Sequence, residues 1–357
     1  MANKWAVLAA LALLMPAYLD IMAQDKEEKP VFNLKATKFE ISGQIQVRAS
    51  FETNDFDTRR GDDNDLVNFR RVRLEFKGEF SKEVGFFIRP EFKGTNTQLL
   101  DAYLKFNYVP LPTIYAGSMV TALSLESNQS NKTDLETLER AQVVNLMRSF
   151  EPGVKVEDRL LDKKLYYCAT ITNGNGNYSQ TNDNDHFYYV GRVNYKVLDE
   201  TAVGAEKLSL SAGGTYGYGQ TGQTRANTLF AVNRRGLQTL TGIETRLTYG
   251  QAALQAEYMK VDFNPSPGGL MNVHMSGYYV QGSYFVIPKK LRTVAKYEAF
   301  DPNDAINNYK DNDWTTLGLT YLIKGHDLKI ETNYIIKDEA KDDLKNNVVY
   351  LQVQMLF

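Results

Sequence analysis

The densest basic run in the sequence is Arg70-Arg71-Val72-Arg73, and its residue types suit contact with anions. Alternate residues of a strand share one face, so Arg71 and Arg73 would point to the same side of an extended segment. Guanidinium groups offer fixed forks of N–H donors to carboxylate or phosphate oxygens. Glu75 follows on that face and would neutralise one of the two arginines. The run therefore leaves two interpretations open, anion guidance and structural pairing.

Other charged side chains also stand at alternate positions of extended segments, where they would line a polar interior. The basic residues that we expect to line this interior and guide anions are Arg48, Arg71, Arg73, Arg89, Lys105 and Arg140. The acidic and tyrosine side chains that we expect beside them are Glu75, Asp101 and Tyr103. A polar channel lined by such groups would select solutes by charge. The alternative is that opposite charges pair across strands and hold the wall together.

Motifs for other chemistry are weak. The three histidines, His186, His274 and His326, stand far apart without a His or Cys partner at ligand spacing, so no metal site is expected. The aspartates of residues 55–65 depart from the EF-hand spacing, and a solvated acidic loop is the simpler interpretation. Cys168 is the only cysteine, so no intrachain disulfide can form.

Enzymatic and nucleic-acid functions have little support in the sequence. It contains no Gly-x-Ser-x-Gly elbow, no compelling Ser/His/Asp set and no phosphate-cradling glycine loop, so we expect neither an enzyme nor a cofactor. The formal net charge is -2, from 41 basic and 43 acidic residues. This balance gives no reason to expect nucleic acid as a partner. Tyrosine (22) and phenylalanine (18) are abundant, which suits strands that are apolar on one side.

The elements that must position these residues are strands, because apolar residues recur at alternate positions from residue 36 onward. The clearest case is the last segment, 349–357, in which Leu351, Val353 and Met355 would face away from Gln352 and Gln354. A soluble sandwich would show the same alternation, with its polar face in water. Alternation alone therefore does not establish a membrane barrel.

The lengths of the links between strands favour the barrel. Dividing the chain gives about sixteen strands. Long polar links are expected at residues 53–64, 119–150, 174–184, 219–234, 264–274, 302–312 and 339–345, and they alternate with short ones. The link at residues 94–96 is the exception, being short where a long one is due. Short periplasmic turns and long extracellular loops are typical of transmembrane β-barrels, in which apolar residues face lipid and polar residues the lumen.

The N-terminus has the pattern of an export signal, residues 1–23. Lys4 supplies the positive end, and Trp5 to Leu14 form an apolar stretch too short to span a membrane. We expect residues 24–35 to be a short periplasmic lead and residues 36–357 to form an outer-membrane barrel. Within the longest link, Asp134 to Val144 has a helix-compatible composition.

Several short motifs also occur in a characteristic order along the mature chain. They are Phe69-Arg70-Arg71-Val72-Arg73-Leu74 with Gly78 and Phe80, Leu100-Asp101-Ala102-Tyr103, Tyr115-Ala116-Gly117, Ser124-Leu125-Glu126, Leu138-Glu139-Arg140, Asn173-Gly174 and the terminal Phe357. In this order they resemble the phosphate-selective porin family of the O and P type. The resemblance implies a 16-stranded barrel, often trimeric, with an inward-folded third extracellular loop and basic residues that guide phosphate. Residues 118–122 lack the lysine and proline that the family often has there, so we leave the solute open.

Three functions follow as hypotheses. The first is an outer-membrane porin for passive diffusion of small hydrophilic solutes, including anions such as phosphate. Its expected partners are outer-membrane lipid, the solutes and two further copies in a homotrimer. The second is a non-conducting barrel that serves as a structural or binding component of an envelope complex. The third, an outer-membrane hydrolase, lacks an evident pair of nucleophile and base.

Overall fold

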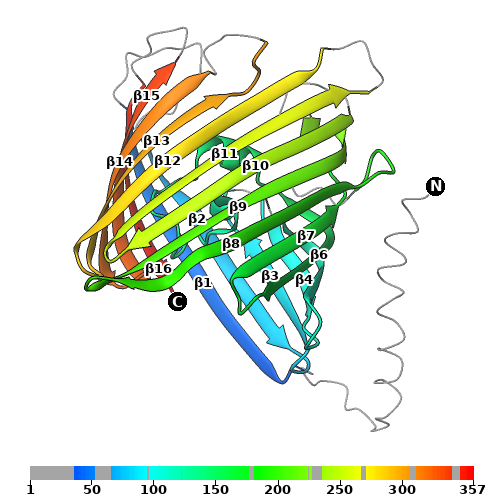
Figure 1. Cartoon of the computed structure of the whole chain (residues 1–357), viewed down its shortest axis with the longest axis horizontal. Helices are drawn as coiled ribbons and strands as arrows, with labels where there is room; N and C mark the ends of the chain where they lie inside the picture. Colours follow the sequence, from blue (N-terminus) through cyan, green and yellow to red (C-terminus); the bar gives the residue numbers. More distant parts are fainter. Residues whose placement is uncertain are drawn as a thin grey trace.

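The chain forms a closed barrel of sixteen antiparallel strands, in which each strand pairs with its neighbours in sequence and β1 pairs with β16 (Figure 1). The computed structural model describes residues 36–52, 66–94, 96–121, 123–176, 181–223, 225–226, 235–266, 271–305, 311–339 and 346–357. The expected signal segment 1–23 and lead 24–35 lie outside the described residues, as does the acidic link 53–65. The predicted fold class and strand number are confirmed.

The strands follow one another around the wall. Their bounds are β1 (Lys38–Glu52), β2 (Leu66–Glu79), β3 (Val84–Glu91), β4 (Gln98–Phe106), β5 (Thr113–Val120), β6 (Phe150–Leu160), β7 (Leu165–Thr172), β8 (Tyr188–Val203), β9 (Glu206–Thr221), β10 (Gly236–Tyr249), β11 (Ala252–Pro265), β12 (Val273–Ile287), β13 (Leu291–Asp301), β14 (Asn312–Lys324), β15 (Leu328–Glu339) and β16 (Val348–Leu356). β3, β5 and β7 have 8 residues each, whereas β8 and β9 have 16. The wall is therefore shorter on the side of β3–β7.

Side-chain exposure shows why these segments form strands. On β16, Leu351 and Val353 are 44% and 42% exposed on the outer face, whereas Gln352 and Gln354 are buried inside. A strand with lipid on one side and a polar interior on the other satisfies all backbone hydrogen bonds within the closed sheet. The alternation that predicted the strands thus has the barrel as its physical cause.

The C-terminus closes the barrel. Phe357 and Gly43 exchange two backbone hydrogen bonds, of 2.7 and 3.2 Å between nitrogen and oxygen. The Phe357 ring lies against Gly43, where an added Cβ would come within 2.3 Å of the ring carbon Cζ. A residue larger than glycine at this position would therefore displace the terminal ring from the seam.

The predicted alternation of long and short links is confirmed. The short links lie at 80–83, 107–112, 161–164, 204–205, 250–251, 288–290 and 325–327, and the longer ones at the opposite strand ends. The link at 92–97 remains short among the long ones, as expected. We refer below to the two ends of the barrel as the short-turn end and the long-loop end.

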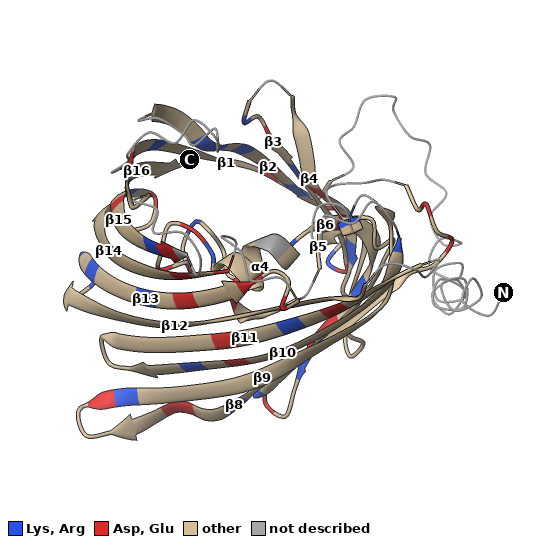
Figure 2. Cartoon of the chain, turned by 90° about the horizontal axis from the view of Figure 1, so that it is seen from above, with Lys and Arg blue, Asp and Glu red and all other residues tan. Residues whose placement is uncertain are grey.

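The longest link, between β5 and β6, lies inside the barrel. Its described residues 123–149, called the inner segment below, contain α3 (Leu125–Asn128) and α4 (Gln142–Met147), and Figure 2 shows α4 enclosed by the ring of strands. Within the stretch Asp134–Val144, whose composition is compatible with a short helix, only residues 142–144 are helical, as the start of α4, and residues 131–139 form turns and bends. None of the helices in the described residues has the length and apolar character needed to cross a membrane.

A hydrophobic core fixes the inner segment to one side of the wall. Val144 and Met147 of α4 are completely buried. They belong to a cluster that includes side chains of β8 and β10–β12, among them Tyr188, Leu240 and Tyr279. Burial of a side chain of this size contributes about 1.5–3 kcal/mol. The inner segment is therefore part of the folded barrel interior.

Candidate functional site

Glu139 of the inner segment binds a group of arginines on β1 and β2. Its carboxylate accepts hydrogen bonds from Arg70 at 2.6 and 2.8 Å and from Arg48 at 2.7 Å. Arg71 lies 3.7 Å from the same carboxylate and also donates to Gln46 at 2.7 Å. Burial raises the pKa of Glu139, but the charges of Arg70, Arg71 and Arg48 outweigh that effect and hold it well below its usual value. This cluster joins the inner segment to the wall.

A β-bulge places Arg70 and Arg71 on the same side. Between β1 and β2 the register shifts, since Gln46 pairs with Arg71 and the next residue, Val47, pairs with Phe69. Arg70 is the extra residue, and a bulge of this kind turns consecutive side chains toward one face. Strict alternation would have directed Arg70 toward lipid.

Arg73 and Arg89 lie on the neighbouring part of the wall and are both paired. Arg73 bonds Glu91 at 2.9 Å and Asn131 at 3.3 Å. Arg89 donates from Nε to Asp101 at 2.8 Å and lies 3.5 Å from Glu75. Structural pairing, the alternative left open by the sequence, thus describes the geometry of these arginines.

Two further arginines of the inner segment contact its own backbone carbonyls. Arg140 donates to Glu126 at 3.0 Å and to Gln129 at 2.5 Å. Arg148 donates to Ser127 at 3.0 Å, and its guanidinium carbon lies 4.8 Å from the centroid of the Phe150 ring. Burial lowers the pKa of Arg148 well below its usual value, and the like charges of Arg140, Arg89 and Arg73 lower it further. Arg89 of the wall also lies over the Phe150 ring, with its guanidinium carbon 5.9 Å from the centroid. Arg148 therefore shares this ring with Arg89, and we call these two, together with Arg73 and Arg140, whose charges also act on Arg148, the arginine cluster.

Carboxylates of the wall hold the backbone of the inner segment. Glu257 on β11 accepts the N–H of Glu126 at 2.6 Å, and Glu298 on β13 accepts that of Gln142 at 2.7 Å. Glu136 of the inner segment bonds Arg246 on β10 at 2.7 Å. Burial raises the pKa of Glu126, whose side chain accepts the N–H of Ala141 at 2.8 Å. The charged side chains of the wall therefore bind the inner segment and hold it in place rather than line an open solute path.

An aromatic and charged band covers the inward face of β4–β7. Tyr103 and Tyr115 meet edge to face with ring centroids 5.3 Å apart. Glu157 accepts the hydroxyl protons of Tyr115 at 2.7 Å and Tyr166 at 2.9 Å. Lys155 lies 3.3 Å from Glu157 and 4.0 Å from the centroid of the Tyr115 ring. This band faces the interior on the side where the wall is shortest.

The residues selected from the sequence thus fall into three places. Arg48 and Arg71 meet at Glu139, whereas Arg89, Glu75 and Asp101 form one network with Lys132, which lies 2.7 Å from Glu75. Arg73 lies on the same part of the wall and pairs with Glu91. Arg140 binds backbone carbonyls of the inner segment, whereas Tyr103 and Lys105 lie nearer the short-turn end.

Sequence reasoning missed Arg70, Glu139 and Arg148 as members of the site. The motif Leu138-Glu139-Arg140 contained a signal for Glu139, but only its arginine was selected. No alternation pattern identifies Arg70, because the bulge breaks the period. Arg148 precedes Ser149 in a link, where strand periodicity gives no information.

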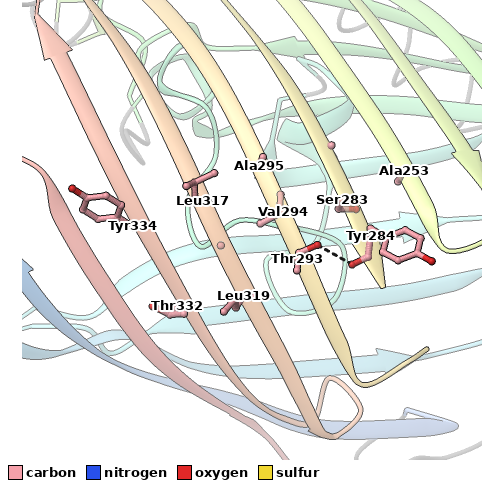
Figure 3. A pocket seen from close by; sticks show the side chains of 12 residues that line it. Ala253, Ser283, Tyr284, Thr293, Val294, Ala295, Leu317, Leu319, Thr332 and Tyr334 are labelled. Carbon is pink, nitrogen blue, oxygen red and sulfur yellow. Dashed lines mark hydrogen bonds between the residues drawn. The ribbon is translucent and has the colours of Figure 1, made fainter. Parts of the chain in front are cut away.

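Two other features do not add a site. The described residues contain no group of three or more His, Cys, Asp or Glu side chains suited to a metal ion. A hollow of about 670 Å³ lies across β11–β15, and several of its lining side chains, including Tyr284, Leu317 and Leu319, belong to the exposed outer face (Figure 3). No charged side chain lines this hollow, which agrees with an apolar membrane-facing wall.

Solved structures of similar fold are outer-membrane channels and related proteins. The anion-selective porin from Comamonas acidovorans has a TM-score of 0.65 and 13% identity over 90% of this chain and 99% of that one. The trimer form of OmpT, an outer membrane protein of Vibrio cholerae, has a TM-score of 0.62 and 12% identity, with 90% and 99% covered. The outer membrane channel DcaP of Acinetobacter baumannii has 0.60 and 15%, with 92% and 100% covered. At such identities the likeness shows the fold.

Sequence comparison identifies the family. An uncharacterised protein of Aquifex aeolicus (strain VF5) is 32% identical over 112 residues, which make up 30% of this chain and 26% of that relative. The matched region is thus about a quarter of the relative's length. The profile of the family described as phosphate-selective porin O and P matches residues 39–357, nearly the whole described barrel. The chain therefore belongs to the phosphate-selective porin O and P family of outer-membrane porins.

Proposed function

We propose that this barrel is a passive diffusion pore for small hydrophilic solutes and that it prefers anions. The observation that carries the preference is the cluster of Arg73, Arg89, Arg140 and Arg148, in which Arg89 of the wall and Arg148 of the inner segment lie over the same Phe150 ring and the like charges of all four act on one another. Charges that converge in a narrow cleft with low-dielectric walls raise the local concentration of counter-ions. Dissolved anions then meet a higher local positive potential than the net charge of the chain suggests.

The inner segment acts as the constriction in this proposal. Its hydrogen bonds reach β1, β2 and β10–β16, and its apolar core lies on β8 and β10–β12. The solute path then follows the inward face of β3–β7, past Arg89 and the tyrosine band. The longest link enters from the long-loop end, which we assign to the extracellular side.

Phosphate is one candidate anion, because fixed guanidinium forks match its oxygens. Each arginine of the cluster nevertheless has protein partners, so a passing anion must share or displace them. Shared donors favour rapid passage over tight binding, since conduction requires weak sites. We therefore propose a general anion preference, of which phosphate is one case.

We also propose a homotrimer that packs through the short wall. An 8-residue strand falls short of the 9–11 residues that a membrane-spanning strand needs. The outer face there exposes Phe80, Ile88 and Leu104 around a hollow of about 410 Å³. Contact with a second copy would cover this thin part of the wall. Light scattering of the detergent-solubilised protein tests the proposal, and a monomer at all concentrations contradicts it.

Single-channel recording in planar bilayers tests the pore. Correctly folded protein is expected to give stepwise conductance, and the reversal potential in a KCl gradient is expected to show chloride more permeant than potassium. Added phosphate should reduce the chloride current if the two anions share the path. A folded barrel without conductance refutes the proposal.

The non-conducting alternative has one observation in its favour, the ion pairs by which Glu139 joins the inner segment to β1 and β2. It predicts that the folded protein binds an envelope partner in stoichiometric amount and conducts nothing. Co-purification in mild detergent, followed by the bilayer recording, separates the two functions.

A further inference from the structure

A small pocket opens at the short-turn end, among residues of β2–β5 and their turns. Its volume is about 220 Å³, and its lining includes Phe87, Tyr103, Tyr115 and Lys105. The Phe87 and Tyr103 rings have centroids 5.5 Å apart and are tilted by 36°, while Tyr115 meets Tyr103 at 81°. Three aromatic rings from three adjacent strands thus form one side of the pocket.

Lys105 stands at the centre of this arrangement in the sheet register. It pairs with Gly85 on β3 and with Tyr115 on β5, while Phe87 pairs with Tyr103 one row away. Gly85 has no side chain, and an added Cβ there would come within 2.9 Å of the Gly78 carbonyl oxygen, so no larger residue fits beside Lys105 in this row. In the described part of the chain, the Lys105 ammonium group has neither an ion pair nor a hydrogen bond.

Of the other charged residues that line the pocket, Lys77 and Glu83 have side-chain partners, whereas Glu79 and Lys82 make no side-chain ion pair or hydrogen bond within the described residues. Lys77 lies 3.7 Å from Glu40, and Glu83 accepts a hydrogen bond from Ser81 at 2.8 Å. The Tyr115 hydroxyl donates to Glu157. Among these charged groups, Lys105 is the cation that the sheet register places beside the aromatic rings, and a cation there calls for an anionic group and a flat apolar ring on the same molecule.

We infer that this pocket is a solute subsite for small aromatic carboxylates, with the ring against Phe87 and Tyr103 and the carboxylate on the Lys105 ammonium group. The inference rests on the proposed pore and deepens it by naming a class of solute. The volume suits one ring better than an oligosaccharide. A sugar would also need several free hydrogen-bond donors and acceptors, whereas the aromatic side of this pocket offers mainly ring faces.

The test uses the purified full barrel, with benzoate as the probe and cyclohexanecarboxylate as its non-planar counterpart of equal charge. Equilibrium dialysis of radiolabelled probe against the detergent-solubilised protein measures binding. Recording in planar bilayers measures the block of chloride current. Benzoate is expected to bind and block at lower concentration than cyclohexanecarboxylate. Phe87→Leu and Lys105→Gln should each weaken benzoate about fivefold, and Phe87→Leu should leave cyclohexanecarboxylate nearly unchanged.

Two matched controls exist at the same end of the barrel. Phe285→Leu removes an aromatic ring from β12, and Lys290→Gln removes a charge from the turn after it; both should leave benzoate binding unchanged. Equal binding of the two carboxylates, or equal losses in the control variants, overturns the subsite. Stepwise chloride current without benzoate binding also overturns it and leaves the pore intact, whereas dialysis binding without any conductance refutes the pore alone.

Discussion

Replacing Glu139 by glutamine tests how the inner segment is held and how charge sets ion preference. The Glu139 carboxylate accepts hydrogen bonds from Arg48 and Arg70 and lies near Arg71, and the Glu139 side chain is 25% exposed. Removing one partner of a buried ion pair costs about 3–5 kcal/mol, and partial exposure reduces this to about 2–3 kcal/mol of docking free energy. The apolar core around α4 remains, so we expect local loosening of residues near 139 while α4 stays in place.

The electrostatic effect can be estimated separately. One unit charge at about 10 Å through water changes the energy of a monovalent ion by about 0.4 kcal/mol, and screening at 0.1 M salt reduces this to about 0.15 kcal/mol. Since the anion gains what the cation loses, the chloride-to-potassium permeability ratio should rise about 1.7-fold. The shift should nearly vanish in 1 M KCl, where the Debye length is about 3 Å.

The assay measures the reversal potential in a salt gradient, which reports ion preference. It also measures the current noise, which reports loosening of the inner segment. Glu139→Gln with Arg70→Gln restores the charge and should return the potential to the original value. Asp134→Asn removes the same charge from an exposed position of the inner segment and should leave the noise unchanged. The reasoning is refuted if Glu139→Gln alters neither quantity at low salt, or if Asp134→Asn reproduces both.

The remaining predictions concern pH, the arginine cluster and the apolar core. Because arginines hold the pKa of Glu139 well below its usual value, its contribution persists from neutral pH down to about 4.5 and is lost only at lower pH, so lowering the pH from 7 to 4.5 should leave current noise unchanged. Burial raises the pKa of Glu126, so ionisation of Glu126 opposes docking of the inner segment as pH rises. Glu126→Gln should therefore keep the current noise low at pH 8. Glu126→Ala leaves the Ala141 N–H without its acceptor and should raise the current noise. Arg148→Gln should lower the chloride-to-potassium ratio about 1.7-fold in 0.1 M KCl, with Lys290→Gln as a control for net charge. Met147→Ala should cost about 2–5 kcal/mol of docking free energy and give larger, noisier currents, while heat-dependent gel mobility still shows a folded barrel.

The wall could be predicted from the sequence because its pattern has a local cause. Each strand meets lipid on one side and a polar interior on the other. The residue type alone therefore indicates which way a side chain such as Val353 or Gln354 points. Link lengths are equally local, since they depend on where alternation stops. Strand number and the order of short and long links therefore followed from the sequence.

The interior depended on contacts that alternation does not encode. The bulge at Arg70 adds one residue to β2 and brings a third arginine to Glu139. The alternation of apolar and polar residues around Arg70 does not reveal this bulge. In the inner segment, composition favoured a helix at Asp134–Val144. There, however, wall side chains such as Asn333 and Arg292 bind backbone groups of Leu138 and Leu135. Those partners come from the other end of the chain and appear only after the barrel closes.

The same contacts limit what the arginines can do for selectivity. Arg48 and Arg70 share one carboxylate from the inner segment, and Arg140 is occupied by backbone carbonyls. Arg148 has a carbonyl and a ring as partners but no carboxylate among the contacts of the described residues, so its charge is the least compensated of the cluster. Anion preference should therefore respond more strongly to Arg148 than to Arg48, although Arg48 lies on the wall and Arg148 in a link. Equal shifts for the two substitutions would contradict this reasoning, because they would show that compensation by protein partners does not set the share of each arginine in the selective field.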